Sequence, residues 1–247
     1  MKDHKPFFWL HIKKSAGSTT RQLLEPHYTT LENVKKPKIF IQAQKNEYND
    51  ILNNHKIPLG EYQFRRGLFA KKFLYPDEWD NTFSFAFSRE PVDRCVSMFF
   101  YLFWKRTDRN FIKRLAEVLK QSGKHKKVLW NTSYAFDLFL DLIQQAQVSD
   151  SIYRPVKLHF TTHVNPMWND ITDEDNNIIL TKLFRMENLT ESINQVFEEC
   201  GIDKKIPQKS TSYNVNKKRR PYEPSKEQLK VIQQIYKNDF EIYESLK

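Results

Sequence analysis

The apolar positions of the chain gather in short runs that predict strands, and the clearest runs lead into helical patterns. Residues 7–10 are apolar without interruption and bounded by polar residues, which predicts a short buried strand. Residues 82–88 carry aromatic side chains at alternate positions, which predicts a strand with one strongly apolar face. Residues 178–184 predict another buried strand, followed by a helix that ends near Gly201. We therefore expect several strand–turn–helix units.

Weaker patterns fill the intervals between these units. Two short apolar runs, residues 39–41 and 62–64, predict further strands. Residues 153–168 have no regular period, so we expect an irregular segment there. Helical periodicity is found in residues 47–54, 110–121, 134–147 and 225–246.

The turn after the first strand has the composition of an anion-binding loop. It spans residues 11–20 and contains a single glycine, Gly17, and the lysine Lys14. The N–H groups and the positive end of the dipole of the following helix point toward such a turn. Gly17 lets the backbone approach a ligand closely. Hydroxyl donors are supplied by Ser15, Ser18, Thr19 and Thr20. The lysine precedes the glycine, which the common nucleotide-binding loop does not allow, and an ordinary turn with solvated lysines is the alternative.

A second group of polar residues follows the strand at residues 82–88. Arg89 stands at the end of this strand, where ligands gather in open α/β sheets, and Pro91 suits the first position of a helix. Arg94 and Ser97 are three residues apart and so share a helix face. A guanidinium at the strand end and a hydroxyl on the helix, converging on one place, suit a phosphate dianion. The alternative is a helix start with a pair of surface arginines.

The two motifs together resemble those of sulfotransferases that use 3′-phosphoadenosine 5′-phosphosulfate (PAPS). The order K-[ST]-x-G-[ST]-[ST] after a strand is similar to their 5′-phosphosulfate loop, although Lys13 replaces a proline and Ala16 replaces the first glycine. The pattern R-x-P-x-x-R-x-x-S, which begins at Arg89, is similar to their 3′-phosphate motif with every defining position filled. The likeness runs from about residue 7 to the C-terminus and is loose between the motifs. It is closest to carbohydrate and heparan-type O-sulfotransferases.

The resemblance implies an α/β fold of three layers, with a central, mostly parallel sheet flanked by helices as in P-loop-containing sulfotransferases. It also implies that Lys14 neutralises the bridging oxygen as the S–O bond breaks. Arg89 and Ser97 are expected to hold the 3′-phosphate, with added charge from Lys218 and Arg219. No metal is expected, because the protein's cations stabilise the leaving group. The 5′-phosphosulfate is expected to bind the loop residues Lys14, Ser15, Ala16, Gly17, Ser18, Thr19 and Thr20.

The general base is not marked by the resemblance, because one expected motif is incomplete. Many carbohydrate sulfotransferases carry a glycine–histidine pair after the third strand, whereas this sequence reads Arg66-Gly67-Leu68. Arg65 and Arg66 suit an anionic acceptor such as an acidic sugar. Glu187, which follows the late strand, is expected to be structural. The candidates for the base are His163, His159, Glu61 and His55, none with a spacing argument, and we take His163 as the catalytic candidate.

The composition of the chain indicates its cellular compartment and the classes of partner that it could bind. The chain has 247 residues, enough for one domain over residues 1–247, and its 40 lysines and arginines exceed its 30 acidic residues by 10. This excess suits an anionic partner, although a solvated surface has the same composition. The chain has no apolar run that could span a membrane, and no signal peptide is expected. Cys95 and Cys200 are too few for a disulfide framework, so we expect reduced thiols in a cytoplasmic protein.

The function expected from the sequence is sulfuryl transfer from PAPS to a hydroxyl, on a carbohydrate or a related small molecule. A P-loop-like kinase is disfavoured by the position of the lysine and by the lack of an obvious magnesium-binding acid. A basic nucleic-acid-binding protein would interleave exposed aromatics with basic residues, whereas most aromatics here stand at core spacing, so no nucleic-acid partner is expected. A sulfotransferase-like fold without activity also stays open, because the family histidine is missing.

Overall fold

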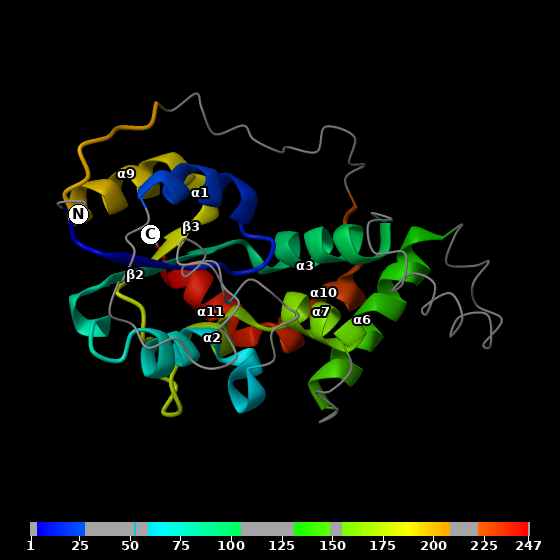
Figure 1. The fold of residues 1–247 in the computed structure, drawn as a ribbon. Helices are drawn as coiled ribbons and strands as arrows, with labels where there is room; N and C mark the ends of the chain where they lie inside the picture. Colours follow the sequence, from blue (N-terminus) through cyan, green and yellow to red (C-terminus); the bar gives the residue numbers. More distant parts are fainter. Residues whose placement is uncertain are drawn as a thin grey trace.

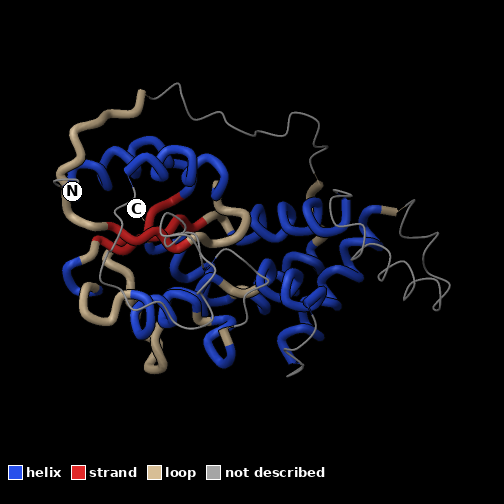
Figure 2. Tube along the Cα trace, in the orientation of Figure 1, coloured by secondary structure: helices blue, strands red, loops and turns tan. Residues whose placement is uncertain are grey.

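The structure, a computed structural model, describes residues 4–27, 52, 59–104, 131–148, 155–207 and 222–246 of the chain. Its centre is a parallel sheet of β1 (Phe7–Leu10), β2 (Phe83–Ser88) and β3 (Lys182–Arg185), in the spatial order β1-β2-β3. Helices lie on both faces of this sheet and extend beyond one end of it (Figure 1, Figure 2). The α/β fold expected from the sequence is confirmed.

Both faces of the sheet are covered, which explains why the apolar run of β1 is unbroken. All four residues of β1 and all six residues of β2 are buried, as is usual for parallel strands with helices on both sides. In the register of the sheet, Phe8 pairs with Ser84 and Ala86 pairs with Leu183. The strands therefore run side by side in one direction, and the polar residues that follow β1 and β2 come to the same edge.

One face of the sheet is covered by α1 (Gly17–Leu24) and α9 (Leu189–Cys200), which lie side by side in Figure 1. Trp9 and Phe85 project into the apolar cluster that fills this layer. α9 ends at Gly201, whose φ of 71° is a left-handed conformation that glycine adopts without strain. This helix end is where the sequence predicts it.

The opposite face is covered by α2 (Arg66–Phe69), α8 (Met167–Ile171) and α11 (Lys237–Ser245) (Figure 1). Phe8 and Ala86 belong to the apolar cluster of this layer. Neighbouring residues of one strand thus pack into different clusters, because successive side chains of a strand point to opposite faces.

A third apolar cluster lies beyond the sheet and is built from helices alone. Phe99 is buried at its centre, and its ring meets that of Phe136 at a centroid distance of 5.1 Å. The helices that form this cluster are α3 (Pro91–Phe99), α6 (Thr132–Val148), α7 (Pro155–Val164) and α10 (Lys226–Ile235) (Figure 1). α3 continues directly from the end of β2, so it joins this cluster to the sheet.

Single helical turns complete the described elements. Two of them are π-helical and continue α2 and α3, namely η5 (Ala70–Leu74) and η7 (Phe100–Trp104). The 3₁₀ turns are η1 (Glu25–His27), η4 (Gly60–Phe64), η6 (Trp79–Asn81) and η8 (Met186–Asn188).

Two of the predicted elements are wrong. The expected strand at residues 62–64 lies in η4, where Gln63 Oε1 accepts a hydrogen bond from Leu59 N and closes the chain on itself. Residues 153–168, expected to be irregular, contain α7 and the start of α8. Proline is compatible with the first turn of a helix, and α7 begins at Pro155 while Pro166 is the N-cap residue of α8.

Other boundaries differ from the prediction by a few residues. The last helix is divided at Tyr236, whose φ of −115° and ψ of 29° separate α10 from α11. β3 begins at Lys182, because Ile178 is instead part of an isolated antiparallel bridge. Cys95 and Cys200 are buried and form no disulfide. The predicted elements at residues 39–41, 47–54 and 110–121 lie outside the described residues, apart from Leu52.

Candidate active site

The loop between β1 and α1 lies at the edge where the strands end, and its backbone is unusual. Lys14 and Ala16 have φ values of 69° and 58°, in the left-handed region that non-glycine residues rarely adopt. Such residues turn neighbouring N–H groups toward one side and form a concave surface suited to an anion. Each costs about 1–3 kcal/mol, and this strain is concentrated at functional sites. The loop is therefore the first candidate for a binding site.

The N-cap residue of α1 is an alanine, whose side chain cannot cap the N–H groups of the helix. Its N-cap residue, Ala16, makes no side-chain hydrogen bond, and its first turn has no acidic residue. The Thr20 hydroxyl donates to the Ala16 carbonyl oxygen at 3.2 Å. Ser15 Oγ, in contrast, is buried without a hydrogen-bond partner among the described residues, which is rare for a buried hydroxyl. Ser15 Oγ is thus a donor for which the described residues supply no acceptor.

Gly17 is required at its position by the ring of His11. A Cβ atom on Gly17 would lie 1.8 Å from His11 Nε2 and 2.4 Å from Cε1. The His11 ring is itself stacked on Trp9, with ring centroids 5.0 Å apart. The sequence indicates that Gly17 permits a close approach, and the structure adds that the approaching group is the protein's own imidazole.

Two single substitutions, Gly17→Ala and Ala16→Gly, will change the free energy of unfolding in opposite directions. We expect Gly17→Ala to lower the free energy of unfolding by about 1–3 kcal/mol, because the new methyl group displaces the His11 ring. We expect Ala16→Gly to be neutral or stabilising, because it removes about 1–2 kcal/mol of left-handed strain and adds about 0.5–1 kcal/mol of chain entropy. Urea unfolding of both variants measures the difference. Equal losses would contradict this description of the loop.

The Lys14 side chain lies over an aromatic ring. Its Nζ is 4.3 Å from the centroid of Tyr101, a residue of η7, which is a distance at which cation and ring attract each other. The Tyr101 ring is in turn stacked on that of His163, with centroids 5.0 Å apart and an interplanar angle of 20°. His159 contacts the same ring at 6.0 Å. The loop, η7 and α7 therefore meet at one place.

His163 is held as a neutral imidazole with a defined tautomer. Its Nδ1 lies 2.7 Å from the His159 carbonyl oxygen, which can only accept, so Nδ1 carries the proton and Nε2 carries the lone pair. Burial, followed by the positive charge of Lys13, holds the pKa of His163 well below its usual value. A neutral histidine with its Nε2 lone pair available is in the form that a general base requires.

Arg89 stands at the end of β2 and reaches the loop. Its Nη1 donates to the Lys14 carbonyl oxygen at 3.3 Å, and its Nη2 lies 3.6 Å from the exposed carboxylate of Asp93. Arg89 Nε is buried and has no hydrogen-bond partner in the part of the chain that the structure describes. Ser97 is buried on α3, two turns after the end of β2. Arg89 thus links the two predicted binding motifs through the loop backbone.

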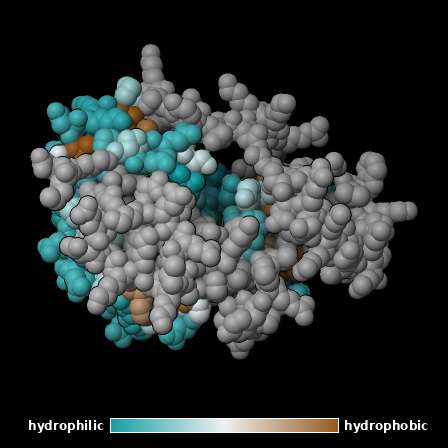
Figure 3. Space-filling model, in the orientation of Figure 1, coloured by the Kyte–Doolittle hydropathy of each residue, from teal (hydrophilic) through white to brown (hydrophobic). Residues whose placement is uncertain are grey.

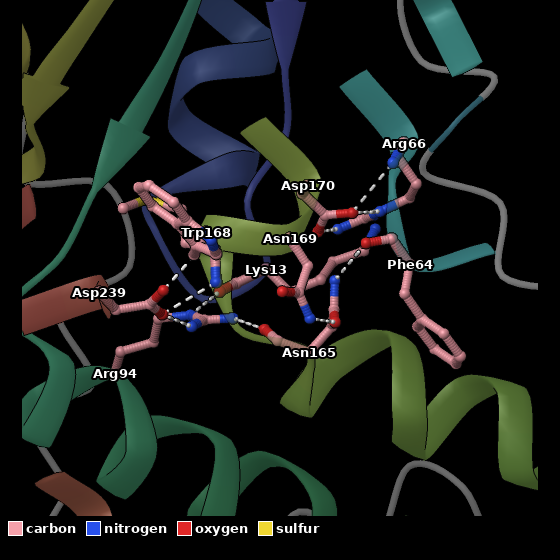
Figure 4. A network of polar contacts seen from close by, with 10 residues as sticks. Lys13, Phe64, Arg66, Arg94, Asn165, Trp168, Asn169, Asp170 and Asp239 are labelled. Atoms are coloured by element: carbon pink, nitrogen blue, oxygen red, sulfur yellow. Dashed lines mark hydrogen bonds and ion pairs between the residues drawn. The ribbon is translucent and has the colours of Figure 1, made fainter. Parts of the chain in front are cut away.

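Arg94, the middle residue of the second motif, binds groups of the protein itself. Its guanidinium is buried and every nitrogen is used within the protein (Figure 4). Nε donates to the Lys13 carbonyl oxygen at 3.2 Å, and Nη2 donates to the Asn165 carbonyl oxygen at 2.6 Å. Nη1 forms an ion pair of 3.0 Å with Asp239. The same guanidinium therefore holds the backbone next to Lys14 and the backbone close to His163.

Asp239, the partner of Arg94, also binds the first turn of α8. Its two carboxylate oxygens accept hydrogen bonds from Met167 N and Trp168 N, both at 2.8 Å. Burial raises the pKa of Asp239 above its usual value, and Arg94 and the two N–H donors act in the opposite direction. Through these contacts the carboxylate joins α11 to α3 and α8 (Figure 4).

Comparison with known families decides the class of protein. The model of the Sulfotransferase family matches residues 1–244. The chain belongs to the sulfotransferase family. No curated protein and no solved structure matches it. The sulfotransferase is thus an enzyme of sulfuryl transfer. The loop follows the end of β1, and Arg89 follows the end of β2.

The sulfotransferase uses Arg66 inside its core, so the expectation that Arg66 binds an acceptor is wrong. Arg66 is 2% exposed and forms a bidentate ion pair with Asp170, with Nε donating to Oδ1 at 3.0 Å (Figure 4). The adjacent Gly67 is needed for this arrangement, because a Cβ atom there would lie 2.4 Å from the Asp170 carbonyl oxygen. The segment that replaces the family's glycine–histidine pair therefore anchors α2 to α8.

The other predicted site residues lie in several places. Arg65 is half-buried. The hydrogen bond from Lys72 is the main cause that lowers the pKa of Glu174, and the charge of Arg65 adds to it. Glu61 is exposed in η4, and Glu187 is exposed in η8. His55, Lys218 and Arg219 lie outside the described residues.

The visible surface in the region of the loop is hydrophilic. Figure 3 shows hydrophilic residues near the middle of the molecule, in the region of the blue loop after β1 in Figure 1. In the described part of the chain, no three His, Cys, Asp or Glu side chains gather in a way that could hold a metal ion. A search of the same residues finds no helix with the length and apolar character to cross a bilayer.

Sequence reasoning missed two residues of this site, Tyr101 and Asp239. Tyr101 follows Met98, Phe99 and Phe100, and in such a run its ring is indistinguishable from a core residue. Asp239 stands in a helix with many polar residues, so only its pairing with Arg94 reveals its role. The available signal was the helical spacing that puts Asp239 and Tyr236 on one side of the last helix.

Proposed function

We propose that this sulfotransferase transfers a sulfuryl group from PAPS to a hydroxyl of a carbohydrate or of a related small molecule. The observation that carries the proposal is the loop after β1, with its left-handed backbone, an alanine at the N-cap of α1 and the buried hydroxyl of Ser15. These features favour a bound anion at the N-terminus of α1. The family match supports the reaction, and the two motifs support the donor.

The donor would lie across the ends of β1 and β2. Its 5′-phosphosulfate would take hydrogen bonds from the backbone and hydroxyls of residues 14–20, and its 3′-phosphate would take them from Arg89 and Ser97. The buried Nε of Arg89 supports this assignment, because a guanidinium nitrogen in that state gains a partner when an anion binds. Lys218 and Arg219 remain candidates for added charge.

Lys14 is the candidate for stabilising the leaving group. As the acceptor oxygen forms its bond to sulfur, the bond between sulfur and the bridging oxygen breaks, and negative charge develops on that oxygen. An ammonium group within a low-dielectric site lowers the energy of this charge without moving a proton. Lys14 suits the role, because its backbone carbonyl is bound by Arg89 and its ammonium group lies on the Tyr101 ring.

His163 is the candidate for the general base that the sequence left without a family equivalent. Its Nε2 lone pair would accept the hydroxyl proton of the acceptor as the new S–O bond forms. Its contacts with Tyr101, and the influence of Lys13 and Lys14 on its pKa, support a position next to the donor loop. An anionic acceptor would interact with Arg65, whereas Arg66 is already paired with Asp170.

A thermal-shift series tests the donor proposal. We expect 3′,5′-ADP to raise the melting temperature more than 5′-ADP, ATP with magnesium, or a short single-stranded oligonucleotide. A ligand at a hundred times its Kd stabilises the folded state by about 2.7 kcal/mol, which a melting curve resolves easily. Arg89→Ala will abolish the selective shift. Arg185→Ala is the matched control, because Arg185 ends the neighbouring strand β3 and donates to the Tyr243 carbonyl oxygen.

The other outcomes of the series distinguish the alternatives. Stabilisation by ATP with magnesium alone would favour a kinase. A salt-sensitive shift with the oligonucleotide and none with nucleotides would favour a nucleic-acid-binding protein. Selective binding of 3′,5′-ADP without transfer to any hydroxyl would indicate a sulfotransferase fold that has lost its activity.

A further inference from the structure

We infer that Tyr101 is a positioning residue, which holds the Lys14 ammonium group and the His163 imidazole in a fixed relation across the transfer site. The inference rests on the proposed function, since it assigns Lys14 to the leaving group and His163 to the acceptor hydroxyl. The inference adds a third residue, Tyr101, which lies in η7 and belongs to neither of the two donor motifs.

The contacts of the Tyr101 ring carry this inference. The ring lies 4.3 Å from Lys14 Nζ and is stacked on His163 with centroids 5.0 Å apart. It is half-buried in η7, the π-helical turn that continues α3. π-Helical turns are rare in proteins, and those that do occur are often found at functional sites. The side chain therefore extends from a well-packed helix into the space between the loop and α7.

Each contact of the Tyr101 ring restricts a side-chain motion that would otherwise slow the transfer. The lysine side chain has four rotatable bonds, and attraction to the face of an aromatic ring restricts where its ammonium group can be. The imidazole of His163 is fixed at one nitrogen by the His159 carbonyl oxygen, and stacking fixes the plane of its ring. Sulfuryl transfer requires the leaving oxygen and the attacking oxygen on opposite sides of the sulfur. A ring that contacts both the cation and the base limits how far the two groups can move relative to each other before the substrates arrive.

The same ring contributes to keeping His163 neutral. Within the described ranges, the titratable and charged groups near His163 are Lys13 and Lys14 from the loop, His159 from its own helix, and Tyr101 from η7. Burial is the first cause of the lowered pKa, and the ring is part of what covers the imidazole. Removing the ring admits water and releases Lys14, and both changes raise the pKa of His163. A base is active above its pKa, so the acid limb of the kcat profile will move to higher pH.

Three variants test the inference on the full chain, with PAPS as donor and a desulfated heparin oligosaccharide as acceptor. We expect Tyr101→Leu to lower kcat by about 10- to 100-fold, since misplacement of reacting groups by an ångström has effects of this size. KM for PAPS will change by less than about threefold. Tyr101→Phe keeps the ring and will stay close to wild type. Tyr62→Leu is the matched control, because Lys72 Nζ lies 5.6 Å from the Tyr62 ring, away from the loop.

A second readout does not depend on turnover. The imidazole C2 proton of His163, assigned by its loss in His163→Gln, is titrated by NMR from neutral pH down to the lowest pH at which the protein stays folded, because the pKa of this histidine lies well below its usual value. In Tyr101→Leu its midpoint will rise, and in Tyr101→Phe it will not. Unchanged kcat, acid limb and NMR midpoint in Tyr101→Leu would overturn the inference while PAPS-dependent transfer by the wild type upholds the proposed function. If the wild type neither binds 3′,5′-ADP nor transfers a sulfuryl group, the proposed function fails. An unchanged His163 midpoint in Tyr101→Leu would then also show that the Tyr101 ring does not influence His163.

Discussion

Lys14→Met will lower kcat by about 10²- to 10³-fold, the loss seen when one donor to a developing oxyanion is removed. Methionine keeps the unbranched stem of lysine, so the Tyr101 ring remains covered and the fold is unaffected. KM for PAPS will change much less than kcat, because the bridging oxygen carries little charge until its bond to sulfur breaks. Steady-state kinetics with varied PAPS separates the two effects.

Lys72→Met is the control for this experiment. Lys72 also lies over a tyrosine ring and pairs with Glu174, but it is an exposed residue of η5. Its loss will leave kcat unchanged, since exposed ion pairs contribute little. If Lys14→Met keeps full activity, the charge that stabilises the leaving group comes from elsewhere, and the proposed mechanism is wrong at its central step.

Local patterns were sufficient to predict the strands and turns that carry the donor motifs. β1 and β2 begin and end within a residue of the predicted bounds, because an unbroken or alternating apolar run has few other structures to adopt. The start of α3 follows from local chemistry as well. Pro91 stands at its first position, and the side chain of Glu90 accepts from Val92 N and Asp93 N.

The role of Arg94 could not be predicted from its neighbours in the sequence. Helical spacing puts it on one face with Ser97, and this spacing fits a phosphate site as well as a buried ion pair. Its partner Asp239 is 145 residues away, and no local pattern indicates which carboxylate comes into contact. Arg94, whose spacing also fits a phosphate site, therefore stabilises the site through contacts within the protein.

The segment at Arg66 and Gly67 illustrates the same limit. Two adjacent arginines before a glycine suggest a surface for an anion, but Asp170 arrives from a distant helix and buries one of them. The contact of Tyr101 with His163 also joins separate elements. What the sequence leaves open is thus the pairing of distant side chains, whereas the strand-end motifs depend on residues that are close in the chain.

The buried pair of Arg94 and Asp239 sets the largest expected loss of stability. Asp239→Asn will lower the free energy of unfolding by about 3–5 kcal/mol, because it leaves the Arg94 charge buried without a counterion. Both side chains are almost completely buried, at 4% and 3% exposure. The amide of asparagine also presents N–H groups where Arg94, Met167 and Trp168 already donate. Guanidinium unfolding, with linear extrapolation to water, measures the loss.

Glu241→Gln is the matched control on the same helix. Glu241 lies two residues after Asp239, and its pair with Lys237 is exposed, with 3.9 Å between Nζ and Oε1. Its loss will cost less than about 0.5 kcal/mol, as is usual for exposed pairs at this spacing. If the two substitutions cost the same, the Asp239 carboxylate does not compensate the buried charge, and Arg94 must be stabilised by the carbonyl oxygens alone.

The double variant Arg94→Met/Asp239→Leu separates the charge from the hydrogen bonds. Removing both charges avoids the uncompensated arginine, and apolar replacements of buried pairs are often neutral or stabilising by about 1–4 kcal/mol. Here the recovery will be only partial, because the Lys13 and Asn165 carbonyl oxygens and the N–H groups at the start of α8 lose their partners. The double variant will thus be more stable than Asp239→Asn but will bind 3′,5′-ADP more weakly than wild type, since the loop backbone is no longer held. Wild-type affinity in this variant would mean that the loop keeps its shape without Arg94.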